Sequence, residues 1–148
     1  MAQVIRFYAV TATSPFEEEE MGYQFPAIYF EATRVCNLQC QACMAGSNDA
    51  ARVRASRQRE LSFDEIRDLV LLPAKRLGVL AIGWSGGEFL LRKDAFDLLR
   101  LTVDLGYQCK VCSNGELLTR ERLQAIKEAT GGKVTIAFGL NSIDTVLI

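Results

Sequence analysis

Three cysteines lie within a span of eight residues, at Cys36, Cys40 and Cys43. This spacing is too close for an ordinary disulfide framework, but three soft thiolates in one loop suit an iron–sulfur cluster that keeps one iron open. A structural zinc site is the second interpretation, although such a site needs a fourth ligand. A third interpretation places the thiols on the buried face of a helix, but the polar residues between them argue against it.

The composition limits which other chemistry the chain can support. Its 148 residues include five cysteines and no histidine, so metal or redox chemistry must rest on cysteine and carboxylate side chains. With 17 basic and 18 acidic side chains the formal charge is -1, which gives no general electrostatic reason to bind nucleic acid or an anionic membrane. The longest uncharged stretch, 35–48, spans 14 residues, too few for a membrane helix. We therefore expect a soluble protein of the reducing cytoplasm.

The segments around the cysteines alternate between strand and helix patterns. Runs of β-branched and aromatic residues predict four strands, at 27–33, 78–84, 107–112 and 133–140. Apolar spacing predicts three helices, one following the capping box Ser62–Glu65, one from about 93 to 105 and one over 120–130. In the first helix the predicted inward residues are Ile66, Leu69, Val70 and Leu77. This order predicts an α/β fold of parallel βαβ units, with helices packed outside a curved sheet.

The loop after the first strand is unusually long. About 28 residues separate that strand from its helix, far beyond the usual two to six, so we expect the loop to be functional or partly mobile. The cysteines start at the carboxyl end of the strand, where parallel α/β folds build their sites. Four arginines follow them and are expected to be a solvated part of the loop, or alternatively to dock an acidic peptide or anionic substrate, at Arg52, Arg54, Arg57 and Arg59.

Two further motifs follow the second and third predicted strands. Ser85-Gly-Gly-Glu88 comes after the second strand, and Ser113-Asn-Gly115 comes after the third. Each is consistent with a simple turn, because glycine and asparagine are common turn residues. Glycine also allows a ligand to approach the backbone closely, which is the functional interpretation. Since both motifs end parallel strands, they are expected at the same edge of the sheet as the cysteines.

With these motifs in this order, the sequence resembles the radical SAM superfamily, whose signature is C-x3-C-x2-C in the loop after the first strand. Ser85-Gly-Gly-Glu88 resembles the family's second-strand motif, and Ser113-Asn-Gly115 resembles its threonine–asparagine–glycine motif. Glu31-Ala-Thr-Arg34 resembles the entry seen in the branch that includes peptide-modifying maturases and haem-pathway enzymes. The resemblance implies an N-terminal extension over 1–26 and, over 27–148, the N-terminal part of the radical SAM core, a partial and incomplete (β/α) barrel with four parallel strands.

The resemblance also implies the cofactors and their ligands. Cys36, Cys40 and Cys43 would hold a [4Fe–4S] cluster whose open iron binds S-adenosylmethionine (SAM). Reductive cleavage of SAM would give a 5′-deoxyadenosyl radical that abstracts hydrogen from a peptide or small-molecule substrate, with no catalytic side chain assigned. Residues expected at the SAM site follow the second, third and fourth strands: Gly86, Gly87, Glu88, Ser113, Asn114, Asn141 and Ser142, with Asp144 a further ribose contact.

Other expectations concern the core and the partners. Cys109 and Cys112 lie three apart on a strand and so point to opposite faces, which favours structural cysteines over a metal pair, and Trp84 is expected in the core. The resemblance implies an electron donor such as flavodoxin or ferredoxin. An incomplete barrel exposes its last strand, 134–140, so self-association or a complementing chain is expected. Two functional alternatives stay open: a non-catalytic or degenerate iron–sulfur or peptide-binding domain, and a structural zinc protein.

Overall fold

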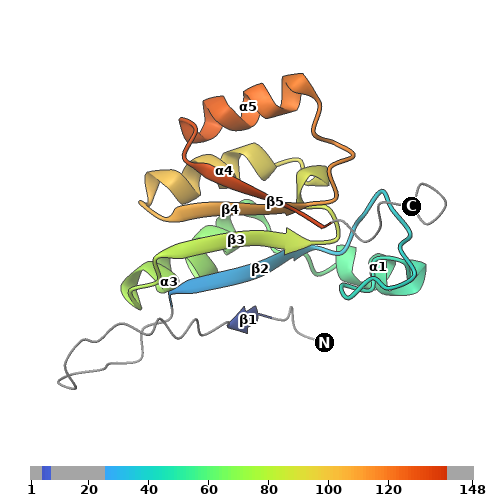
Figure 1. The fold of residues 1–148 in the computed structure, drawn as a ribbon. Coiled ribbons are helices and arrows are strands. Elements are labelled where there is room, and N and C mark those ends of the chain that lie inside the picture. Colours follow the sequence, from blue (N-terminus) through green and yellow to red (C-terminus); the bar gives the residue numbers. More distant parts are fainter. Residues whose placement is uncertain (1–4, 8–25, 140–148) are drawn as a thin grey trace, which may run out of the picture.

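The computed structural model describes residues 5–7 and 26–139. The strands among these residues form one five-stranded sheet (Figure 1). The strands follow one another across the sheet in chain order, β1 (Ile5–Phe7), β2 (Ala27–Thr33), β3 (Ala81–Gly86), β4 (Gln108–Ser113) and β5 (Val134–Phe138). Strand β1 is antiparallel to β2, and the four strands from β2 to β5 are parallel. The predicted α/β fold with four parallel strands in an open, partial barrel is confirmed.

The helices lie between consecutive parallel strands. They are α1 (Ala50–Arg57), α2 (Phe63–Ile66), the π-helical segment η1 (Arg67–Leu71), α3 (Leu72–Arg76), the 3₁₀ turn η2 (Phe89–Leu91), α4 (Ala95–Asp104) and α5 (Arg120–Thr130). Ser62 and Glu65 form the predicted capping box at the start of α2, and Thr119 caps α5. Helix α5 ends before Gly131, whose φ of 59° suits the left-handed position after a helix.

The first predicted helix is divided by a π-helical turn. Pro73 has no N–H to donate, and the wider turn of η1 just before it relieves the clash of its ring with the preceding turn. The extra residue rotates the following positions, so Leu71 and Ala74 enter the core. Leu69 and Leu77 are 64% and 69% exposed, and the prediction that they point inward was wrong. The regular 3.6-residue period of an α-helix does not continue across the π-helical turn.

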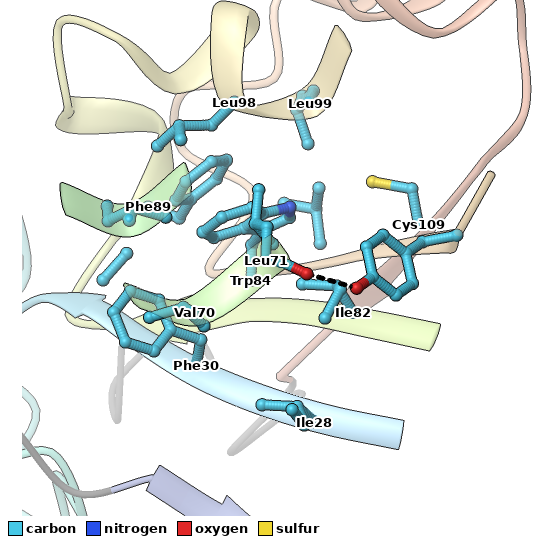
Figure 2. Packing of buried hydrophobic residues seen from close by; sticks show 14 of the residues in the cluster. Ile28, Phe30, Val70, Leu71, Ile82, Trp84, Phe89, Leu98, Leu99 and Cys109 are labelled. Carbon is cyan, nitrogen blue, oxygen red and sulfur yellow. Dashed lines mark hydrogen bonds between the residues drawn. The ribbon is translucent and has the colours of Figure 1, made fainter. Parts of the chain in front are cut away.

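One apolar core lies between the sheet and the helices (Figure 2). Trp84 is at its centre, fully buried, with its ring edge-on to Phe30 at 6.0 Å and stacked on Phe89 at 5.0 Å. Its indole Nε1 donates to Thr102 Oγ1 at 3.2 Å, so the one polar atom of the ring has a partner. The prediction that Trp84 is a core residue is confirmed.

The two cysteines of β4 lie on opposite faces of the sheet, as predicted. Cys109 is buried in the core, and burial raises the pKa of its thiol to about 12. Cys112 is half-buried on the other face, where burial also raises its pKa. A strand that alternates in this way cannot bring both sulfurs to one metal ion, so a metal site made by this pair does not form.

Candidate functional site

The cysteine loop begins where β2 ends and lies at the carboxyl end of the parallel strands, to which the arrow of β3 points (Figure 1). Successive turns build it, because Cys43 N–H donates to Cys40 O and Gly46 N–H donates to Cys43 O, both at 3.2 Å. Gly46 has a φ of 68°, a conformation that glycine adopts without strain. The loop is therefore a folded chain of turns rather than an extended connection.

Helix α1 follows these turns inside the segment that the sequence predicted to be one long loop. Asp49 caps it by accepting hydrogen bonds from the N–H groups of Ala51 and Arg52. None of its residues is buried in the described structure, which explains why the sequence shows no apolar periodicity over this helix. The signal that could have revealed it is the N-capping aspartate. The four arginines are exposed, as predicted for a solvated segment, but three of them lie on this helix.

The three thiols are partly exposed, and two of them accept backbone hydrogen bonds. Cys36 Sγ accepts from Leu38 N–H at 3.4 Å, and Cys43 Sγ accepts from Ser47 N–H at 3.3 Å. Burial alone would raise the pKa of the Cys43 thiol, but hydrogen bonds from the N–H group and hydroxyl of Ser47, and from the N–H groups of Ala45 and Gly46, outweigh it and lower that pKa. Within residues 5–7 and 26–139, no three cysteine or carboxylate groups lie close enough together to hold a metal ion. The three sulfurs therefore lie in the same loop but do not form a ready-made ligand set.

Polar side chains hold the two ends of the cysteine loop together. Arg34, just before the first cysteine, donates through Nη1 to Ala45 O at 2.7 Å. Asn48 donates through Nδ2 to Cys40 O at 3.0 Å. Both bonds span the turns that carry the thiols, so they limit how far the loop can open.

The glycine pair Gly86 and Gly87, at the end of β3, touches the backbone from which the cysteine loop starts. Gly87 N–H donates to Thr33 O, and Glu88 N–H donates to Val35 O, both at 2.8 Å. A Cβ at Gly86 would lie 2.1 Å from Thr33 O, and one at Gly87 would lie 2.3 Å from Val35 O. Gly86 also has a φ of 127°. Glycine is therefore required at both positions, because the carbonyl groups of Thr33 and Val35 leave no room for a Cβ. The same close contact holds the residues before Cys36 against the end of β3.

Glu88 joins the second motif to the third from a fully buried position. Its Oε2 accepts from Ser113 Oγ at 3.0 Å and from Asn114 N–H at 2.9 Å, and its Oε1 accepts from Leu90 N–H at 3.2 Å. Asn114 in turn reaches the cysteine loop, with its Nδ2 3.6 Å from Cys36 Sγ. The structure thus brings together residues of all three described motifs at the carboxyl ends of the strands. Asn141, Ser142 and Asp144 lie outside the described residues.

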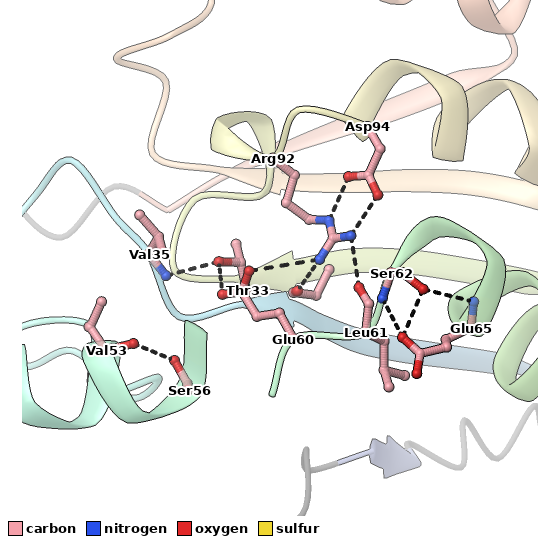
Figure 3. A network of polar contacts seen from close by, with 11 residues as sticks. Thr33, Val35, Val53, Ser56, Glu60, Leu61, Ser62, Glu65, Arg92 and Asp94 are labelled. Atoms are coloured by element: carbon pink, nitrogen blue, oxygen red, sulfur yellow. Dashed lines mark hydrogen bonds and ion pairs between the residues drawn. The ribbon is translucent and has the colours of Figure 1, made fainter. Parts of the chain in front are cut away.

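A second polar network, which sequence reasoning did not find, connects the end of β2 to Glu60 and Leu61, the residues that follow α1 (Figure 3). Arg92, with a side chain only 8% exposed, donates to Ala32 O at 2.9 Å and to Leu61 O at 3.0 Å, and forms a two-point ion pair with Asp94. Thr33 Oγ1 donates to Glu60 Oε1 at 2.6 Å. No spacing rule predicts a partner 60 residues away, so the sequence carries no signal for the contact between Arg92 and Ala32.

A cavity of about 280 Å³ opens beside the cysteine loop, on the face of the sheet opposite the core. Cys43 of the loop and Gly86 of the second motif both line it, together with Glu31 and Ser85. Deeper on the same face, Lys110 Nζ donates to Tyr29 OH at 2.9 Å, and this bond raises the pKa of the lysine. The cavity therefore lies between the Cys43 side of the cysteine loop and the start of the glycine motif.

No helix among the described residues is long and apolar enough to cross a membrane.

The site is thus a thiol-bearing loop at the carboxyl end of an open sheet of parallel strands. A family model, described as the radical SAM superfamily, matches residues 30–147. The chain belongs to the radical SAM superfamily, as its motifs predicted.

Two relatives show which members of the superfamily the chain is similar to. It is 38% identical over 112 residues to a PqqA peptide cyclase of Rhodopseudomonas palustris, covering 76% of this chain and 28% of the relative. It is 33% identical over 103 residues to an AdoMet-dependent heme synthase of Oleidesulfovibrio alaskensis, covering 69% of this chain and 25% of the relative. Both relatives are enzymes by name, and this chain spans 28% and 25% of their lengths. Their names match the two enzyme types, peptide-modifying maturases and haem-pathway enzymes, of the branch that the sequence resembles.

Proposed function

We propose that this chain is the iron–sulfur and SAM-binding part of a radical SAM enzyme, with Cys36, Cys40 and Cys43 as the ligands of a [4Fe–4S] cluster. The observation that carries the proposal is the cavity that Cys43 shares with Gly86, because it places the thiol loop and the glycine motif around one space. Family membership supports the same cofactors, since the superfamily generally binds a cluster and SAM.

The residues around the thiols fit such a cluster. Cysteine thiolates are the usual ligands of iron–sulfur clusters, and N–H groups already point at the sulfurs of Cys36 and Cys43. The buried Ser47 hydroxyl lies close enough to Cys43 to help lower the pKa of its thiol, and a thiolate ligand there would give this hydroxyl a full acceptor. The three sulfurs would have to draw together to share one cluster, as is common for metal sites that form on binding.

Each motif has a distinct task in this proposal. When bound, the reduced cluster and SAM together supply a 5′-deoxyadenosyl radical that abstracts hydrogen from a substrate carbon. The backbone of Gly86 and Gly87 would border the methionyl end of SAM, while Glu88 would hold the second and third motifs in register. Ser113, Asn114, Asn141 and Ser142 would complete the cofactor site.

The proposal also names a class of substrate and a kind of electron donor. One relative is named for a peptide and another for heme, so we propose a peptide or a small molecule as the substrate. The electron that reduces the cluster would come from a donor such as flavodoxin or ferredoxin, in the reducing cytoplasm that keeps these thiols free.

Anaerobic reconstitution with iron and sulfide tests the ligand assignment. We expect about four irons per chain for the unmodified protein and loss of the cluster in Cys40→Ala. Cys112→Ala is the matched control, because that cysteine lies on β4 and should leave the iron content unchanged. One zinc and no iron after anaerobic purification, or a full cluster in a variant lacking all three loop cysteines, would contradict the proposal. A loaded chain that forms no 5′-deoxyadenosine with dithionite and SAM would favour the non-catalytic alternative.

A further inference from the structure

The side chain of Asn114 reaches from the end of β4 to the first cysteine of the loop, across 78 residues of sequence. Its Nδ2 lies 3.6 Å from Cys36 Sγ and 3.0 Å from Asn37 Oδ1. Within the described residues, neither Cys40 nor Cys43 has a side-chain amide at its sulfur. Cys36 is therefore the one thiol of the loop, in this part of the chain, whose sulfur faces an amide from another strand.

The orientation of the Asn114 amide is determined by its other contacts. Its Oδ1 accepts a hydrogen bond from Glu116 N–H at 3.0 Å. A backbone N–H can only donate, so the oxygen must face Glu116 and the NH₂ group must face the cysteine loop. On the main-chain side, Asn114 N–H donates to the buried carboxylate of Glu88. The NH₂ group that faces Cys36 is thus held in place by one hydrogen bond of the Asn114 side chain and one of its main chain.

We infer that Asn114 is a positioning residue that donates a hydrogen bond to the Cys36 sulfur and so raises the reduction potential of the cluster that this loop holds. The inference rests on the proposed function and goes beyond it, because it assigns the amide to a ligand sulfur rather than to SAM. Hydrogen bonds to cluster sulfurs are one of the means by which proteins adjust cluster potentials. A donor stabilises the reduced cluster more than the oxidised one, because the reduced cluster carries more negative charge. With Leu38 N–H, Asn114 gives the Cys36 sulfur two such donors.

A redox titration of the reconstituted chain, followed by EPR of the reduced cluster, tests this role. Asn114→Ala removes the donor and should shift the midpoint potential downward, so that the variant is less than half reduced at the potential that half-reduces the unmodified chain. Asn114→Asp keeps the acceptor for Glu116 N–H, and hence the turn, but replaces the donor with a negative charge. Its midpoint potential should fall below that of the alanine variant.

Asn48→Ala is the matched control. Asn48 also donates an amide hydrogen bond to the cysteine loop, but to the carbonyl groups of Cys40 and Gln41 rather than to a sulfur. Its loss should leave the midpoint potential unchanged. An unchanged potential in a fully loaded Asn114→Ala, or an equal shift in Asn48→Ala, would overturn the inference.

The iron content separates this inference from the proposed function. If the unmodified chain assembles no cluster, the proposed function fails and this inference fails with it. If the unmodified chain and Asn48→Ala are loaded but both Asn114 variants lack iron, Asn114 is needed to form the cluster and not to set its potential, which overturns the inference as stated. Loaded variants with lowered potentials support it.

Discussion

Replacing Gly87 by alanine should destabilise the fold, because the added methyl group would meet backbone rather than a side chain that can move. The new Cβ would lie 2.3 Å from Val35 O and 2.8 Å from Arg34 O. Both carbonyls belong to the segment that leads into Cys36, and Val35 O already accepts a hydrogen bond from Glu88 N–H. The strand ends must therefore separate to admit the methyl group.

The magnitude follows from this contact and from a control glycine. Overpacking of a tight site costs about 1–3 kcal/mol. At Gly139 a Cβ would meet nothing within 4 Å among the described residues, and the backbone is outside the left-handed region. Alanine there should stabilise by about 0.4–1 kcal/mol, because it restricts the unfolded chain. The two variants should thus differ by about 1.4–4 kcal/mol, or roughly 3–16 °C in Tm for a domain of this size.

Urea unfolding of the reduced chain, followed by circular dichroism, measures this difference directly. We also expect Gly87→Ala to take up less iron than Gly139→Ala, since the displaced carbonyls come just before Cys36, the first of the proposed cluster ligands. Equal unfolding midpoints for the two variants would refute the argument that the backbone of Arg34 and Val35 fills the space beside Gly87.

Three other perturbations probe the supports of the site. Arg92→Met leaves Ala32 O and Leu61 O without their donor and Asp94 without its partner, so it should lower the free energy of unfolding by about 2–4 kcal/mol in urea; unchanged stability would contradict this. Glu88→Gln replaces a two-acceptor carboxylate and should cost about 1–3 kcal/mol, while a neutral result would show that Ser113 and Asn114 do not depend on its charge. For Cys109, burial raises the pKa to about 12, so its stabilisation is complete below pH 9 and is lost as the pH rises toward 12. The stability of the unmodified chain should fall more steeply between pH 9 and 11 than that of Cys109→Ala, and parallel curves would be evidence against this.

The sequence predicted the order of the parallel strands because each is a short apolar run that follows a turn signal. The strand ends were less accurate: β3 continues to Gly86, into the motif that was expected to follow the strand. Helix α1 was missed because none of its residues is buried in the described structure. Leu69 and Leu77 were misplaced because a π-helical turn before Pro73 changes the period. These errors arise where tertiary packing or proline chemistry overrides local pattern.

The positions of the three described motifs followed from the sequence, but their contacts did not. Spacing alone could not show that Thr33 O and Val35 O occupy the space beside the glycine pair. Nor could it pair Asn114 with Cys36, or Arg92 with Ala32, because those partners are 78 and 60 residues apart. Such contacts depend on strand register, which the chain sets only on folding.

EPR spectroscopy of the dithionite-reduced, reconstituted chain, recorded with and without SAM, tests the central claim most directly. Three cysteine ligands leave one iron of the cluster open, so SAM should bind there and change the spectrum of the reduced cluster. The account predicts a [4Fe–4S] signal that shifts on addition of SAM and is absent from Cys36→Ala, Cys40→Ala and Cys43→Ala. A cluster signal that SAM leaves unchanged, or one that survives the loss of these cysteines, would contradict it.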